Sequence, residues 1–175
     1  TESASAVHLS VDQHGWIWGI VNRVFPIKVA ARSLLLDSAH GPVPLEAARN
    51  RAADRAHALA NWLSARYGTD PPGREESLLT GLPTREPAFR AKERFADHYF
   101  GRVDKSGRLW GAMFELGLAS TVASSDEPLV ALTSQGLRFA ALPNPVLDDA
   151  VLHEPLSGDE IDSYVELVAM RVPRE

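Results

Sequence analysis

Residues 45–67 restrict the fold of this chain more than any other stretch, because helical periodicity runs through them without interruption. Apolar residues recur there at every third or fourth position, as they do along one face of an α-helix. The members of this face are Leu45, Ala48, Ala52, Ala56, Leu59, Leu63 and Tyr67. Gly68 follows directly and is a typical helix stop. The pattern predicts one long amphipathic helix in a mostly helical protein.

The residues before this helix predict a strand, a buried segment and a second helix. Residues 7–11 alternate apolar and polar side chains, which favours a short strand, and residues 16–21 are too continuously apolar to be exposed. Pro26 suits a first helical position, ahead of a helix over 27–36. The Gly-Pro-Val-Pro sequence at 41–44 ends that helix and leaves room only for a very short extended segment.

The residues after it predict two helices, a hairpin and a capped helix, beyond a linker over 69–85 that is rich in Pro, Gly and charge. A helix over 86–100 and a turn over 101–105 come first, followed by a helix over 106–116 that Ser106 caps and Gly117 ends. Two strands over 118–123 and 129–132 then form the hairpin. The last of these elements is a helix over 134–142, capped by Thr133.

A last helix is expected in the acidic tail over 143–175. Ser157 and Glu160 have the spacing of a capping box at its start. Its apolar side should consist of Ile161, Tyr164, Val165 and Val168. The whole chain then divides into an N-terminal helical region (1–68), the linker (69–85), a central unit (86–142) and the tail.

The central unit ends in the sequence Leu132-Thr133-Ser134-Gln135-Gly136, in which Thr133 can cap a helix and Gly136 allows close approach to a neighbouring element. Together with the preceding helix pair and hairpin, this L-T-x-x-G stretch resembles the winged helix-turn-helix superfamily of prokaryotic type, over about residues 86–142. The resemblance implies a mainly α fold with a small β-hairpin wing and additional N-terminal and C-terminal helices. Residues 1–68 are then part of the same core or a second helix-turn-helix unit.

The resemblance implies DNA binding, with the second helix of the pair in the major groove and the wing against the backbone. Residues at the start of that recognition helix fit phosphate contacts: Arg102, Lys105, Ser106 and Arg108. The rest of that helix is apolar and better suited to the core, and Asp126 and Glu127 at the wing tip would repel phosphate. Arg90 and Arg94 form either a further part of the DNA surface or a solvated face with helical ion pairs.

The net charge of -5 is unevenly distributed along the chain. Residues 141–175 hold eight acidic residues against Arg171 and Arg174, so the first 140 residues carry a slight positive excess. This distribution is compatible with a nucleic-acid contact in the first part of the chain. It also suggests that the acidic tail folds back over the basic positions and masks them.

Several function classes are disfavoured by the sequence. The chain has no cysteine, which excludes disulfides and thiolate sites and fits the cytoplasm, and it lacks the long apolar run of a membrane helix. The six histidines are too scattered for a metal site, and the cluster of Asp148, Asp149, His153 and Glu154 fits a solvated linker better than a Mg²⁺ site. No phosphate-binding glycine loop or nucleophile motif occurs. We therefore expect no catalytic residues, metal or cofactor.

Two function classes remain from the sequence. The first is a non-enzymatic winged-helix protein that binds duplex DNA, as a regulator or as an accessory subunit of a nucleic-acid-handling complex. The second is a protein-interaction module on the same scaffold, which binds a protein partner or a second copy of the chain. The apolar helix over 106–116, the four tryptophans and the acidic final helix favour this second class.

Overall fold

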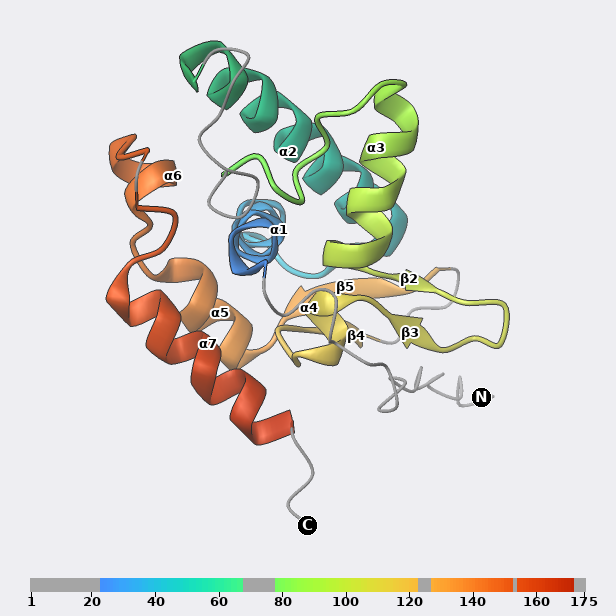
Figure 1. The fold of residues 1–175 in the computed structure, drawn as a ribbon. Helices are drawn as coiled ribbons and strands as arrows, with labels where there is room; N and C mark the ends of the chain where they lie inside the picture. The colour runs from blue at the N-terminus through green and yellow to red at the C-terminus, as the bar shows by residue number, and fades with distance from the viewer. Residues whose placement is uncertain (1–22, 68–77, 123–126, 153, 172–175) are drawn as a thin grey trace, which may run out of the picture.

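The computed structural model describes residues 23–67, 78–122, 127–152 and 154–171, and it is mainly helical with a small antiparallel sheet (Figure 1). Its elements are α1 (Val24–Asp37), β1 (Val43–Pro44), α2 (Leu45–Tyr67), α3 (Ala88–Phe95), η2 (Ala96–Phe100), β2 (Arg102–Val103), β3 (Leu109–Trp110), α4 (Ala112–Glu115), β4 (Ala119–Val122), β5 (Leu129–Leu132), α5 (Ser134–Ala141), α6 (Pro145–Asp149) and α7 (Gly158–Arg171). The strand predicted over 7–11 and the buried segment over 16–21 lie outside the described residues. No helix in the described ranges is both long and apolar enough to cross a bilayer.

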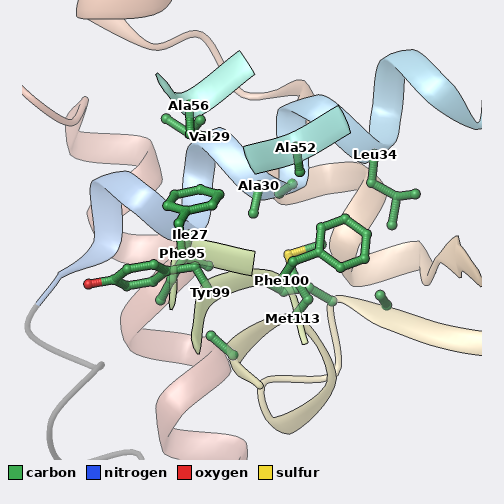
Figure 2. Close-up of a cluster of buried hydrophobic side chains, with 14 of the residues drawn as sticks. Ile27, Val29, Ala30, Leu34, Ala52, Ala56, Phe95, Tyr99, Phe100 and Met113 are labelled. Atoms are coloured by element: carbon green, nitrogen blue, oxygen red, sulfur yellow. The ribbon is translucent and has the colours of Figure 1, made fainter. Parts of the chain in front are cut away.

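The core is built on the packing of α1 against α2 (Figure 2). Alanines from both helices are completely buried, namely Ala30, Ala31, Ala48, Ala52, Ala56 and Ala60. Small side chains let two helices approach closely, and Ile27 and Leu34 of α1 fill the space beside them. The helix predicted over 45–67 is confirmed, and α1 begins three residues before the predicted start at residue 27.

Aromatic side chains from α3 and η2 close the core on another side. Phe95, Tyr99 and Phe100 are buried, and Met113 of α4 packs among them (Figure 2). η2 is a π-helical continuation of α3, so that one extra residue enters the helical turn before the chain leaves at Gly101. The helix predicted over 86–100 is confirmed apart from its first two residues.

The three-stranded sheet joins the two halves of the chain. Its strand order is β1-β5-β4, with Val43 paired to Val130 and Ala119 paired to Leu132, all antiparallel. The predicted short extended segment after α1 is therefore β1, the outer strand beside β5. The described part of the N-terminal region, residues 23–67, contributes to the same hydrophobic core as the central unit.

The β4–β5 hairpin and the helix after it follow the sequence prediction. Both strands lie within the predicted ranges, and the Thr133 hydroxyl accepts a hydrogen bond from the Gly136 amide at 3.0 Å, which caps α5. The same hydroxyl donates to the Gly117 carbonyl at 2.6 Å. A Cβ on Gly136 would lie 1.8 Å from the Leu118 carbonyl oxygen, so the predicted close approach at this glycine is confirmed.

The helix predicted over 106–116 is wrong. Residues 102–110 form the β2–β3 hairpin instead, and only α4 and the turn after it, which Gly117 ends, are helical. Every residue of α4 is buried, so the expectation that the apolar part of this segment belongs to the core is confirmed. The basic residues placed at the start of a recognition helix therefore lie on a hairpin.

A buried ion pair attaches the C-terminal helix to α1. The side chains of Lys28 and Glu160 are both 0% exposed, and Nζ lies 2.8 Å from Glu160 Oε1. The other two protons of the ammonium reach the carbonyl oxygens of Phe139 and Leu142, at 2.6 and 2.7 Å. All three donors of the lysine are thus used. Burial lowers the pKa of Lys28, and the Glu160 carboxylate opposes that shift.

Glu160 also performs the predicted capping function. Its Oε2 accepts from the Ser157 amide at 2.8 Å, and Ser157 Oγ accepts from the Glu160 amide at 3.3 Å, which confirms the capping box. Asn144 donates to both carboxylate oxygens. The carboxylate is therefore saturated with donors, as a buried charge must be.

The predicted apolar side of α7 is only partly correct. Tyr164 is buried and Val168 is half-buried, but Ile161 and Val165 are 49% and 60% exposed. The reason is that Glu160 enters the core to meet Lys28, which rotates Ile161 and Val165 toward solvent.

The Lys28–Glu160 pair should dominate the stability of the C-terminal region. Replacing Lys28 with Met leaves Glu160 buried and unpaired, and we expect a loss of about 3–5 kcal/mol in the free energy of unfolding, measured with urea. Lys92→Met removes a partly exposed ion pair with Asp54 and should cost less than about 1 kcal/mol. Equal losses in the two variants would contradict this assignment.

The two glycines at the starts of α5 and α7 should respond oppositely to alanine. Gly136→Ala drives a methyl group into the Leu118 carbonyl and should destabilise the fold by about 1–3 kcal/mol. Gly158→Ala meets nothing within 4 Å and should be neutral or stabilise by up to about 1 kcal/mol. Thermal unfolding of both variants measures the difference, and a tolerated Gly136→Ala would show that α5 can move away from β4.

Candidate nucleic-acid interface

The turn of the β2–β3 hairpin is specified by Asp104, Lys105, Ser106 and Gly107. Gly107 N donates to the Asp104 carbonyl at 3.0 Å, and Gly107 has φ +78°. This is a type I turn followed by a left-handed glycine, which commonly connects antiparallel strands. Asp104 Oδ1 accepts from Ser106 N, Ser106 Oγ and Arg108 N, so the loop is held by its own aspartate.

Alternation along the two strands separates a buried face from an outward face. Arg102 is paired with Trp110, and Val103 with Leu109. Leu109 is buried and Val103 half-buried, whereas Arg102 is exposed and Trp110 half-buried. Because side chains two residues apart share a face, Arg108 lies on the outward face with Trp110.

Two glycines fix the base of this hairpin. A Cβ on Gly111 would lie 2.3 Å from Gly101 Cα, and a Cβ on Gly101 would lie 2.5 Å from both the Phe114 ring and the Trp110 carbonyl oxygen. Gly101 N also donates to the Ala96 carbonyl at 2.7 Å. The hairpin therefore leaves η2 through a tightly packed base whose two backbones touch.

Basic residues of α3 and η2 continue the outward face of the hairpin. Arg90 and Arg94 are exposed and lie one helical turn apart, and His98 follows in η2. The His98 ring lies 5.4 Å from the Trp110 ring, and the Arg102 guanidinium lies 5.1 Å from the same indole. Arg94 and Arg102 both act electrostatically on His98. We call the set Arg90, Arg94, His98, Arg102, Lys105, Arg108 and Trp110 the α3–hairpin surface. Figure 1 shows the elements α3, β2 and β3 that carry most of it.

Asp97 holds Arg102 in place on this surface. One carboxylate oxygen binds Arg49 of α2, and the other lies 3.1 Å from Arg102 Nη1. The carboxylate thereby connects three elements, α2, η2 and β2. Between residues 85 and 110 the chain has seven basic and four acidic residues, so this region is positively charged in a protein of net charge -5.

The structure brings most of the predicted binding residues together. Arg102, Lys105, Ser106 and Arg108 share one hairpin, Arg94 lies close to it through His98, and Arg90 is one turn further along α3. Asp126 lies outside the described residues, and Glu127 is exposed. Among the described residues, neither Arg90 nor Arg94 forms an ion pair within α3, which favours the surface interpretation over helical pairing for these two residues.

Three arginines of α2 bind acidic residues on other helices. Arg49 does pair with Glu46, one turn away, but it also binds Asp97. Arg51 and Arg55 bind Asp37 of α1, at 2.9 and 2.7 Å. These residues join helices to one another, and they leave the α3–hairpin surface as the basic area with the clearest outward orientation.

The acidic tail does not cover this surface within the described residues. The basic residues that it meets are Lys28 and Arg32 of α1, the latter through Asp148 at 2.9 Å. The Arg32 hydrogen bond lowers the pKa of Asp148. α7 lies against α5, on the side of the molecule opposite to the hairpin (Figure 1). The predicted masking is therefore wrong for the tail up to residue 171.

The sequence contains two signals for the β2–β3 hairpin that the prediction of a helix over 106–116 did not use. The sequence Asp104-Lys105-Ser106-Gly107 is a turn signature, and the flanking pairs 102–103 and 109–110 each combine an inward apolar residue with an outward one. Together they indicate a hairpin. The involvement of His98 and Trp110 follows only from the register and from the η2 geometry, which the sequence does not display.

No group of three or more metal-binding side chains occurs among residues 23–67, 78–122, 127–152 and 154–171. Within that part of the chain, Asp148 is engaged by Arg32 and by the Asn144 amide, so it is a structural residue. Comparison of the chain with protein-family models, with curated proteins and with solved structures finds no match.

His98 reports on the electrostatics of the surface. Burial lowers its pKa below the ordinary 6.5, Asp97 raises it, and Arg94 and Arg102 lower it. The unfolded chain therefore takes up this proton at a higher pH than the folded chain does. Titration of His98 should therefore lower the free energy of unfolding as the pH falls below about 6.5, and it should leave that free energy unchanged at higher pH.

Removal of one neighbouring charge should shift this titration. We expect Arg94→Gln to raise the pKa of His98, because a repelling cation is lost, whereas Arg94→Lys should leave it nearly unchanged. NMR titration of the imidazole protons measures both. A wild-type midpoint above 6.5 would mean that Asp97 outweighs burial and that His98 is more exposed than the structure indicates.

Proposed function

We propose that this chain is a non-enzymatic winged-helix-type protein that binds DNA through phosphate contacts on the α3–hairpin surface. In this role it acts as a regulator or as an accessory subunit of a nucleic-acid-handling complex. The observation that carries the proposal is that the β2–β3 hairpin exposes Arg102, Lys105 and Arg108, and that Arg94 of α3 and Arg102 both act on His98, in a protein that is acidic elsewhere. Such a cluster is the electrostatic footprint of a nucleic-acid contact.

The order of elements supports the winged-helix part of the proposal. A helix, a short strand, two helices and a two-stranded wing follow one another as α1, β1, α2, α3 and β4–β5, and the first strand pairs with the last. In this arrangement α3 takes the place of the recognition helix. The β2–β3 hairpin and α4 are then an insertion between that helix and the wing.

The chemistry of the surface favours contacts to the DNA phosphates over recognition of a base sequence. Its donors are guanidinium and ammonium groups, which suit phosphate, and the residues of α4 that could have entered a groove are buried. We therefore expect steep salt dependence and weak sequence preference. Each phosphate contact that is formed contributes roughly -0.9 to the slope of log K against log salt concentration.

The hairpin tip should control DNA affinity. The double variant Lys105→Glu, Arg108→Glu should weaken binding to a random duplex at least about tenfold and flatten the salt slope by about 2, because two phosphate contacts are lost. The control is Arg66→Glu, Arg138→Glu, which changes the charge equally at exposed positions on α2 and α5. Fluorescence anisotropy across a salt series measures both, and an equal loss in the two variants would contradict the site.

A protein-interaction role is the second candidate, and the exposed apolar residues of α5 and α7 favour it. Leu137, Ile161, Val165 and Met170 are all exposed, and α7 also presents Asp159, Asp162 and Glu166 to solvent. Exposed apolar residues bordered by charge are typical of interfaces. Measuring the mass in solution in the same buffer as the DNA titration separates the two roles, because a monomer that binds DNA needs no partner copy.

A further inference from the structure

We propose that Trp110 is a stacking platform for an unpaired base, so that the α3–hairpin surface takes single-stranded DNA, or a duplex with an unpaired end, in preference to an intact duplex. This inference rests on the proposed function, since the surrounding cations must hold phosphates. It adds the class of nucleic acid that is bound.

The position of Trp110 is unusual for a large aromatic residue. Its strand neighbour Leu109 is buried, but the indole lies on the outward face of the hairpin and is only half-buried. It is surrounded by phosphate-binding groups, with Arg102 across the hairpin and His98 beside it. A partly exposed indole beside such cations combines the two elements of single-strand recognition, a stacking surface and a basic track.

The arginine beside Trp110 is less closely placed over the ring than the arginine beside Trp62. The Arg66 guanidinium lies 3.5 Å from the Trp62 centroid, which is a stacked contact that occupies one face of that ring. The Arg102 guanidinium lies 5.1 Å from the Trp110 centroid, and the His98 ring is tilted by 60°. Arg102 therefore lies less closely over Trp110 than Arg66 lies over Trp62.

The platform is also held in position before binding. Gly101 and Gly111 pack backbone against backbone at the base of the hairpin, and Asp97 restrains Arg102 on the neighbouring strand. A side chain on a rigid support loses little conformational freedom when a ligand binds. The cation nearest to a stacked base would be Arg102, with His98 on the neighbouring element.

A duplex cannot use this platform, because its base faces are covered by their neighbours in the stack. An unpaired base exposes a π-face whatever its identity, so the expected ligand is single-stranded and not sequence-specific. The loss of one stacked base on alanine substitution corresponds to roughly a fivefold to 150-fold change in affinity. A loss of about tenfold is therefore a realistic expectation for one tryptophan.

The test compares oligo(dT) with a random duplex for three variants of the full chain. Trp110→Leu keeps an apolar side chain but removes the aromatic face, and it should weaken oligo(dT) binding about tenfold while changing duplex binding less than about twofold. Trp110→Phe should retain most of the single-strand affinity. Trp62→Leu is the matched control and should change neither ligand.

A second readout is the fluorescence of the tryptophan itself. Oligo(dT) should quench the tryptophan emission of the wild-type chain and of Trp62→Phe, because a base stacked on Trp110 quenches its fluorescence, and the quenching should be lost in Trp110→Phe. Circular dichroism of each variant verifies the fold.

The outcomes separate the stacking inference from the proposed function. If Trp110→Leu weakens both ligands equally, or if the wild type binds duplex at least as tightly as oligo(dT), the stacking inference is overturned while DNA binding stands. If Lys105→Glu, Arg108→Glu binds both ligands like the wild type, the proposed function fails at this surface. The stacking inference is also overturned if Trp110→Leu binds oligo(dT) with the affinity of the wild type and the emission of Trp110→Phe is quenched as strongly as that of the wild type.

Discussion

The ammonium group of Lys28 is the constraint on which the C-terminal half of the structure depends. It is completely buried in α1, and its three protons reach α5, the residue after α5, and Glu160 of α7. A buried charge is tolerated only when each of its hydrogen-bonding positions is occupied. The position of α7 is therefore set by where Glu160 must lie, and the exposure of Ile161 and Val165 is a consequence of it.

The charge distribution differs between the two sides of the molecule. Two acids of the tail, Glu160 and Asp148, bind Lys28 and Arg32 of α1, and α7 lies on the side of the molecule opposite to the hairpin (Figure 1). Of the acids within the basic area, Asp97 binds Arg102 and Asp104 holds the hairpin turn. The protein can thus be acidic in total and still present a positive face for phosphate.

Predictions from the sequence succeeded where the signal was local. The α2 periodicity, the Thr133 cap, the Ser157 and Glu160 capping box and the β4–β5 strands each depend on residues within a few positions of one another. The helix prediction over 106–116 was wrong because the apolar residues of this segment fit one face of a long helix as well as they fit a short buried helical turn. The turn signature at 104–107, which distinguishes the two, is short and is easily mistaken for a helix cap.

The sequence by itself determined the mainly helical class, the long α2 helix, the caps and the presence of basic residues between 90 and 108. Only the tertiary structure decided that β1 completes the sheet, that Lys28 meets Glu160 across more than a hundred residues, and that Arg94, His98, Arg102 and Trp110 share one surface. The physical reason is that periodicity and capping act over a few residues. Strand register and burial of a charge depend on which distant segments pack together, and no local pattern encodes that choice.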